Sequence, residues 1–124
     1  MIPAQDALQR LRDGNARFVA ETRNGGSATG SRRMELATEQ HPFATILGCS
    51  DSRVPAEIIF DQGLGDLFVI RVAGNIVAPS QVGSVEFAAA RCDTRLVVVL
   101  GHSSCGAITA TLEELGRNSD RKSV

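Results

Sequence analysis

Two short segments of the chain carry side chains that could share one metal ion. The first is Cys49-Ser50-Asp51-Ser52-Arg53, and the second is His102-Ser103-Ser104-Cys105-Gly106. Together they offer two thiolates and one imidazole. That is a ligand set of catalytic zinc, which keeps its fourth coordination position open for water. The residue types therefore indicate a zinc enzyme that performs hydrolysis or hydration chemistry.

The elements expected around these segments alternate between strands and helices. Three short apolar runs rich in β-branched residues predict strands buried on both faces, over residues 43–47, 67–72 and 95–100. The spacing of apolar residues predicts helices over 79–92 and 105–115, the second ending at Gly116. This order predicts an α/β fold with a parallel β-sheet core flanked by helices.

The predicted strands bring the candidate ligands to one edge of the sheet. Cys49 follows the first strand, and His102 and Cys105 follow the third. Open α/β sheets bind ligands at the carboxyl ends of their strands, so the three side chains are expected to face each other there. The alternative is two buried thiols and a satisfied histidine, but buried thiols need no histidine and no charged neighbour.

Asp51 and Arg53 are separated by one residue, so both project to the same side of an extended segment. The planar arginine fork holds a carboxylate by two parallel hydrogen bonds. Alone, such a pair is more often only structural. Beside a metal ligand we expect a functional pair. Asp51 then either bonds the metal or is held aside by Arg53, so that water takes the vacant position.

The first third of the chain has a different pattern. Apolar residues over 3–20 predict an amphipathic helix interrupted at Gly14-Asn15, and the glycine-rich residues 23–33 predict a flexible linker. A second helix is expected over 34–40. We expect the first helix to be an arm that packs on a partner subunit, in a homodimer or higher homo-oligomer. The expected division is an arm and linker over 1–33 and a zinc-binding α/β core over 34–124.

The composition favours some partners and locations over others. The formal net charge is -1, with 13 basic and 14 acidic residues and no basic run, so nucleic acid is not an expected partner. No apolar stretch approaches the roughly 18 residues of a membrane helix, so no membrane contact is expected. The three cysteines are expected to be reduced thiols in a cytoplasmic protein.

At these residues the chain resembles the β-class carbonic anhydrases. The segments that carry the resemblance are 14–18, 49–55, 71–75 and 101–106. The resemblance implies Zn2+ held by Cys49, His102 and Cys105, with Asp51 and Arg53 as a catalytic pair and with Asp51 as a ligand only in a closed, inactive state. It also implies a role for Gln40 across a dimer interface, and a carbon dioxide pocket lined by Phe68, Phe87 and Gly106.

Two departures from the family pattern matter. Family members commonly continue with a further strand and helices that cover one edge of the sheet. We therefore expect a truncated product, or a cleaved protein with a separate C-terminal fragment as a partner. The subgroup inhibited by bicarbonate has a tryptophan where this chain has Ile46, which favours the unregulated subgroup with an open site at neutral pH.

The expected reaction is the hydration of carbon dioxide to bicarbonate and a proton. Two alternatives stay open at this point. One is a related zinc hydrolase acting on carbon disulfide or carbonyl sulfide through the same ligands. The other is a catalytically incomplete, zinc-stabilised assembly fragment.

Overall fold

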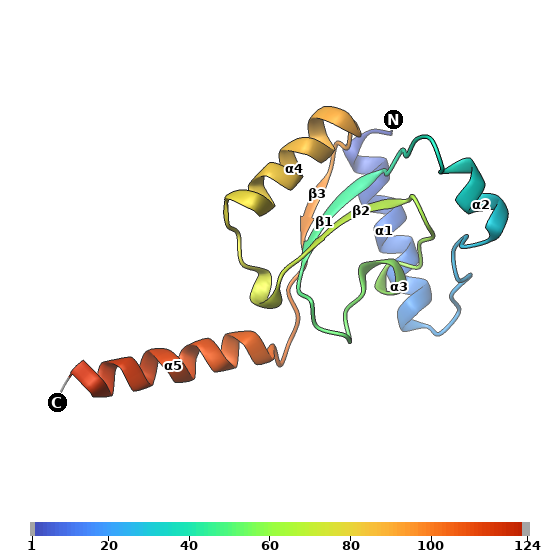
Figure 1. Cartoon of the computed structure of the whole chain (residues 1–124). Coiled ribbons are helices and arrows are strands. Elements are labelled where there is room, and N and C mark those ends of the chain that lie inside the picture. The colour runs from blue at the N-terminus through green and yellow to red at the C-terminus, as the bar shows by residue number, and fades with distance from the viewer. Residues whose placement is uncertain (1, 123–124) are drawn as a thin grey trace.

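The centre of the molecule is a three-stranded parallel sheet. The computed structural model describes residues 2–122, and their side chains up to residue 117. The strands are β1 (Ala44–Gly48), β2 (Leu67–Arg71) and β3 (Val97–Val99), in the spatial order β2-β1-β3. Helices flank this sheet (Figure 1). The predicted α/β fold with a parallel sheet is therefore confirmed.

The register of the sheet fixes where the strands end. Gly48 is paired with Arg71 of β2, and Leu47 is paired with Val99 of β3. The pairing of β3 continues one residue further, because the Leu100 N–H donates to the Leu47 carbonyl over 2.8 Å. All three strands therefore deliver the residues that follow them to the same edge.

The two faces of the sheet are covered by different helices. Leu11 of α1 (Ala4–Val19) packs with Ile46, Leu67 and Phe60, which follows the short helix α3 (Ala56–Ile59). Phe68 is the next residue along β2, and its ring lies 5.9 Å from the ring of Phe87 in α4 (Pro79–Arg91). Side chains alternate between the two faces of a strand. Hence α1 and α3 cover one face, and α4 lies on the other.

The N-terminal helix differs from the interrupted arm that the sequence predicted. α1 is continuous through Gly14, where an added Cβ would stand 1.7 Å from the Phe60 carbonyl oxygen. Gly14 thus permits α1 to approach the backbone at Phe60 closely. The helix also packs on its own chain, because Ala7 and Leu11 are buried there. Contact of α1 with a partner subunit, and a domain boundary at residue 33, stay predictions.

The segment predicted as a flexible linker is attached to the body of the chain. The buried Asp61 carboxylate accepts hydrogen bonds from the Asn24 and Gly25 N–H groups, over 2.9 and 3.0 Å, and pairs with Arg17. Helix α2 occupies Gly30–Glu35, not residues 34–40. It begins early because the Thr29 hydroxyl accepts from the Arg32 N–H and caps its first turn.

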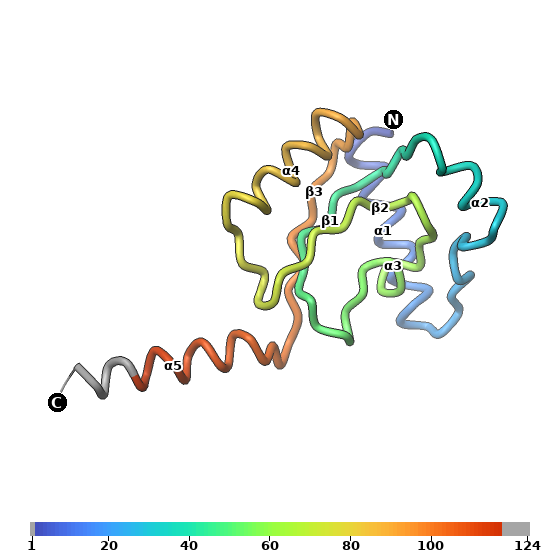
Figure 2. Tube along the Cα trace, in the orientation of Figure 1, coloured from blue at the N-terminus to red at the C-terminus, as the bar shows by residue number. Residues whose placement is uncertain are grey.

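The C-terminal third corrects two further predictions. Val98 packs toward the core, but Val97 and Val99 on the other face are 44% and 67% exposed, so β3 is not covered on both faces. Helix α5 (Gly106–Lys122) does not end at Gly116, because one glycine costs a helix only about 1 kcal/mol. α5 contacts the 3-10 turn η1 (Ala73–Asn75) and otherwise extends away from the body (Figure 2).

None of the helices among the described residues combines the length and the apolar character that crossing a membrane requires.

We predict that Asp61→Asn lowers the melting temperature by several degrees at neutral pH. Hydrogen bonding to Arg17 holds the pKa of Asp61 below its usual range, so the charged carboxylate stabilises the fold above the unfolded pKa of about 3.9. That stabilisation is lost as the pH falls toward the folded pKa. The melting temperatures of the wild type and of Asp61→Asn should therefore converge in acid. The control is Asp93→Asn, at an exposed ion pair, and it should leave the melting temperature nearly unchanged. Equal melting temperatures at pH 7 would contradict this role.

Candidate metal centre

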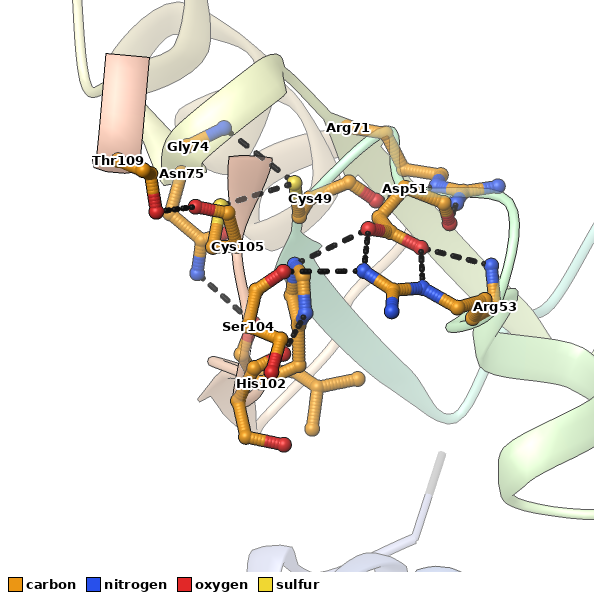
Figure 3. Close-up of polar contacts among 12 residues, drawn as sticks. Cys49, Asp51, Arg53, Arg71, Gly74, Asn75, His102, Ser104, Cys105 and Thr109 are labelled. Atoms are coloured by element: carbon orange, nitrogen blue, oxygen red, sulfur yellow. Dashed lines mark hydrogen bonds and ion pairs between the residues drawn. The ribbon is translucent and has the colours of Figure 1, made fainter. Parts of the chain in front are cut away.

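Three side chains from two strand ends converge on one point. Cys49 follows β1, and His102 and Cys105 lie between β3 and α5 (Figure 3). One ligand atom from each of the three lies within 4.8 Å of the others. The Sγ atoms of Cys49 and Cys105 are 3.9 Å apart. Two sulfurs at about 2.3 Å from a tetrahedral ion would be about 3.8 Å apart. The spacing therefore fits a metal ion without rearrangement.

The histidine is also oriented as a ligand. Its Nδ1 lies 2.9 Å from the Ser103 carbonyl oxygen, to which it can donate a proton, leaving Nε2 with a free lone pair. Nε2 is buried and has no hydrogen-bond partner among the described residues. A buried nitrogen without a partner is costly. A metal ion would satisfy it.

Cys49 is prepared for metal binding by its surroundings. The backbone N–H of Gly74, in η1, donates to Cys49 Sγ over 3.3 Å. This bond, with the nearby His102 ring adding to it, lowers the pKa of Cys49 to about 6. Thiolates, not thiols, are metal ligands. Gly74 adopts φ 73°, and a Cβ there would lie 3.3 Å from the Ala107 side chain, so glycine suits this close approach.

Asp51 and Arg53 form the pair that the sequence predicted, next to the ligand cluster. Asp51 Oδ1 accepts from the Arg53 N–H and Nε over 2.8 and 2.9 Å, and Oδ2 accepts from Nη2 over 2.7 Å. These bonds hold the pKa of Asp51 well below its usual range. Oδ2 lies 3.9 Å from His102 Nε2. Asp51 is therefore an anion beside the ligands, held toward Arg53.

Three side chains around the cluster make hydrogen bonds that were not predicted from the sequence. Arg53 Nη2 also donates to the Ser104 carbonyl, in the turn before Cys105, over 3.0 Å. Arg71 donates to the carbonyls of Cys49 and Asp51. Asn75 Nδ2 donates to the Leu100 carbonyl, just before the His102 turn, over 2.7 Å. Each acceptor is a backbone carbonyl, so no pairing of residue types could have revealed these bonds.

Gln40 is not part of the cluster in this chain. It is exposed and lines a surface groove of about 500 Å³ with residues of α2 and its neighbours. Gln40 lies four residues before β1, whereas Cys49 follows the other end of that strand. At about 3.3 Å per residue, the ends of β1 alone are roughly 13 Å apart. A role of Gln40 in the site of a neighbouring copy stays a prediction.

The residues expected to line a substrate pocket do not line the cavity beside the ligands. A small cavity of about 170 Å³ adjoins the cluster, lined by Gly74, Asn75, Gly101, His102, Cys105 and Ile108. Phe68 and Phe87 contact each other but do not line this cavity, and neither does Gly106, the first residue of α5. The sequence missed Ile108, whose place on an apolar helix face resembled that of a core residue.

Known proteins have sequences similar to this chain. The family model described as carbonic anhydrase matches residues 44–124. A carbonic anhydrase of Mycolicibacterium smegmatis is 51% identical over 109 residues, which span 88% of this chain and 53% of that protein. The chain thus spans about half the length of the curated relatives it matches.

Solved structures agree with this relationship. The structure of the β-carbonic anhydrase CcaA has a TM-score of 0.64 at 34% identity, covering 86% of this chain and 53% of that one. Tetrameric β-carbonic anhydrases of Sordaria macrospora give a TM-score of 0.59 at 33% identity, over 67% of this chain and 47% of theirs. The match of the family model and the identity to these relatives show that the chain belongs to the carbonic anhydrase family. Both of these solved structures are β-carbonic anhydrases.

We predict that the purified protein contains one metal ion per chain, bound by both thiolates of the cluster. Cys49→Ser and His102→Ala should each abolish this binding, because each removes one of three ligands. Cys92→Ser is the matched control, since Cys92 lies outside the cluster. Metal analysis and X-ray absorption measure the outcome. Absence of metal–sulfur scattering near about 2.3 Å would refute the assignment.

Proposed function

We propose that this protein binds zinc and catalyses the reversible hydration of carbon dioxide to bicarbonate and a proton. The observation that carries the proposal is the Cys49, His102 and Cys105 cluster with the Asp51 carboxylate turned toward Arg53 beside it. Two thiolates and one imidazole are a donor set of catalytic zinc. A bound zinc would supply a hydroxide nucleophile near neutral pH.

Asp51 is proposed to orient the nucleophile. Oδ1 already accepts two hydrogen bonds from Arg53, whereas Oδ2 accepts one from Arg53. Oδ2 therefore retains a lone pair, and it is the oxygen nearer to His102 Nε2. As a permanent anion, Asp51 can accept a hydrogen bond from the nucleophile and keep its attacking lone pair aimed at carbon.

Gln40 is proposed to serve the site of a neighbouring copy in a homo-oligomer, and Phe68 and Phe87 are proposed to line the apolar carbon dioxide pocket. The placement of Gln40 beyond the opposite end of β1 from Cys49 supports this. The side-chain amide would donate to a carbon dioxide oxygen as negative charge develops there. Phe87 is 50% exposed in the single chain, so it is available to line an apolar pocket between subunits.

A cytoplasmic location is part of the proposal, because the three cysteines are free thiols of the kind that a reducing compartment maintains. Hydrolysis of carbon disulfide or carbonyl sulfide would use the same ligands, and parallel assays with these substrates separate it from hydration. We prefer hydration because the relative reported at 51% identity is named carbonic anhydrase. If the protein binds zinc but converts none of these substrates, it is instead a zinc-stabilised assembly fragment without catalytic activity.

We predict that Arg53→Ala loses carbon dioxide hydration activity by about 10- to 100-fold while zinc stays bound. Without the fork, Asp51 is no longer held toward Arg53 and can approach the metal position, and raising the pH should restore little activity. Stopped-flow hydration between about pH 6 and 9 measures the effect, because this range spans the expected titration of the nucleophile. The control is Arg95→Ala, at an exposed pair with Asp93. A wild-type rate and pH profile would make Arg53 merely structural.

We predict that two inactive variants restore activity when their subunits are mixed. Gln40→Ala keeps the metal cluster, and Cys49→Ser keeps Gln40. In a mixed oligomer, the metal site of the first would therefore receive Gln40 from the second. The variants are unfolded together, refolded with zinc and assayed against each variant refolded alone. If the mixture is no more active than its components, Gln40 does not act across an interface.

A further inference from the structure

Arg71 is the last residue of β2 and reaches across the end of β1. Its Nε donates to the Cys49 carbonyl over 2.7 Å, and its Nη2 donates to the Asp51 carbonyl over 2.6 Å. Figure 3 shows the guanidinium lying beside the Asp51 segment. One planar group thus bonds both carbonyls that flank Ser50.

Arg71 differs from the arginines of the chain that pair with an aspartate. Arg17, Arg53 and Arg95 each pair with an aspartate. Arg71 has no ion pair among the described residues, and both of its hydrogen bonds go to backbone carbonyls. Arg71 therefore acts on the site through two directed hydrogen bonds, and not by neutralising an acidic side chain.

The backbone of Arg71 is itself held firmly. It is paired with Gly48 in the sheet, and the Val72 N–H donates to the Gly48 carbonyl over 3.1 Å. The guanidinium is thus anchored to the strand end from which the Cys49 segment departs. Hydrogen bonds to these two carbonyls restrict the backbone conformation at Cys49 and at Asp51, and so limit the directions in which their side chains leave the backbone.

We propose that Arg71 is a positioning residue for the metal centre. It sets the Cys49 thiolate and the Asp51 carboxylate relative to each other through their backbone carbonyls. It touches neither the ligand atoms nor the cavity beside them. The inference rests on the proposed zinc function. It adds to that function a residue that holds the Cys49 thiolate and the Asp51 carboxylate in their relative positions.

The test compares Arg71→Gln, Arg71→Lys and the control Arg95→Gln in the purified protein. Glutamine offers one amide nitrogen and lysine one ammonium, so neither reproduces two parallel bonds to carbonyls that flank a residue. Zinc affinity is measured by competition with a chelator. The cobalt(II) form is then compared by its visible absorption, which reports the arrangement of sulfur and nitrogen ligands without any assay of activity. Circular dichroism establishes that each variant is folded.

We expect both Arg71 variants to bind zinc about 10- to 100-fold more weakly than the wild type. Their cobalt absorption should also be altered, whereas Arg95→Gln should match the wild type in both. Wild-type affinity and spectrum in Arg71→Gln would overturn the inference. Wild-type zinc affinity and cobalt absorption in Arg71→Lys would also overturn it, since a positive charge alone would then suffice. Failure of both Arg71 variants to fold would overturn it too, because Arg71 would then be needed for folding itself. If the wild type itself binds no zinc, the proposed function fails instead.

Discussion

The parallel pairing of β1 with β3 is the constraint on which the metal centre depends. Leu47 and Val99 are partners, so the two strands end at the same level of the sheet. Cys49 is then only two residues beyond Leu47, and His102 is only three residues beyond Val99. A shift by one residue would reverse the faces to which the side chains of a strand point. It would also separate the sulfur of Cys49 from the imidazole.

The cluster places several groups of negative character close together. Two cysteine sulfurs lie 3.9 Å apart, with the Asp51 carboxylate nearby. Such a concentration is costly in a partly desolvated place unless donors face it. The donors come from different segments: the Gly74 amide faces a sulfur, and the Arg53 guanidinium faces the carboxylate. The β2 end therefore contributes to the site although it supplies no ligand.

The sequence predicted the sheet and the candidate ligands because both depend on local patterns. Apolar runs located the strands to within a few residues, and the strand ends placed Cys49 beside His102. Side chains that act through backbone carbonyls were not predictable in this way. Arg71 and Asn75 find their acceptors only after the sheet has formed, and any residue could supply those carbonyls. Helix limits failed where one side chain decides them, as the Thr29 cap does for α2.

The covering of the strands was predicted less well for a physical reason. A continuous apolar run indicates two buried faces when helices extend over the whole sheet. At β3, one face turns to the core through Val98, but Val97 and Val99 stay exposed within this chain. The run of valines therefore predicted more cover for β3 than the described residues provide.

The separation of the ligands along the chain has a consequence for how the molecule folds. Cys49 and His102 are on the order of 50 residues apart, so bringing them together requires the closure of a long loop. Contacts of this kind slow folding, because the entropy of loop closure is lost before the contacts form and stabilise the chain. A metal ion held at both ends of the loop acts as a cross-link that only the folded topology can form. The loaded protein should consequently resist unfolding at the β1–β3 pair, where the sheet would otherwise open at its exposed edge.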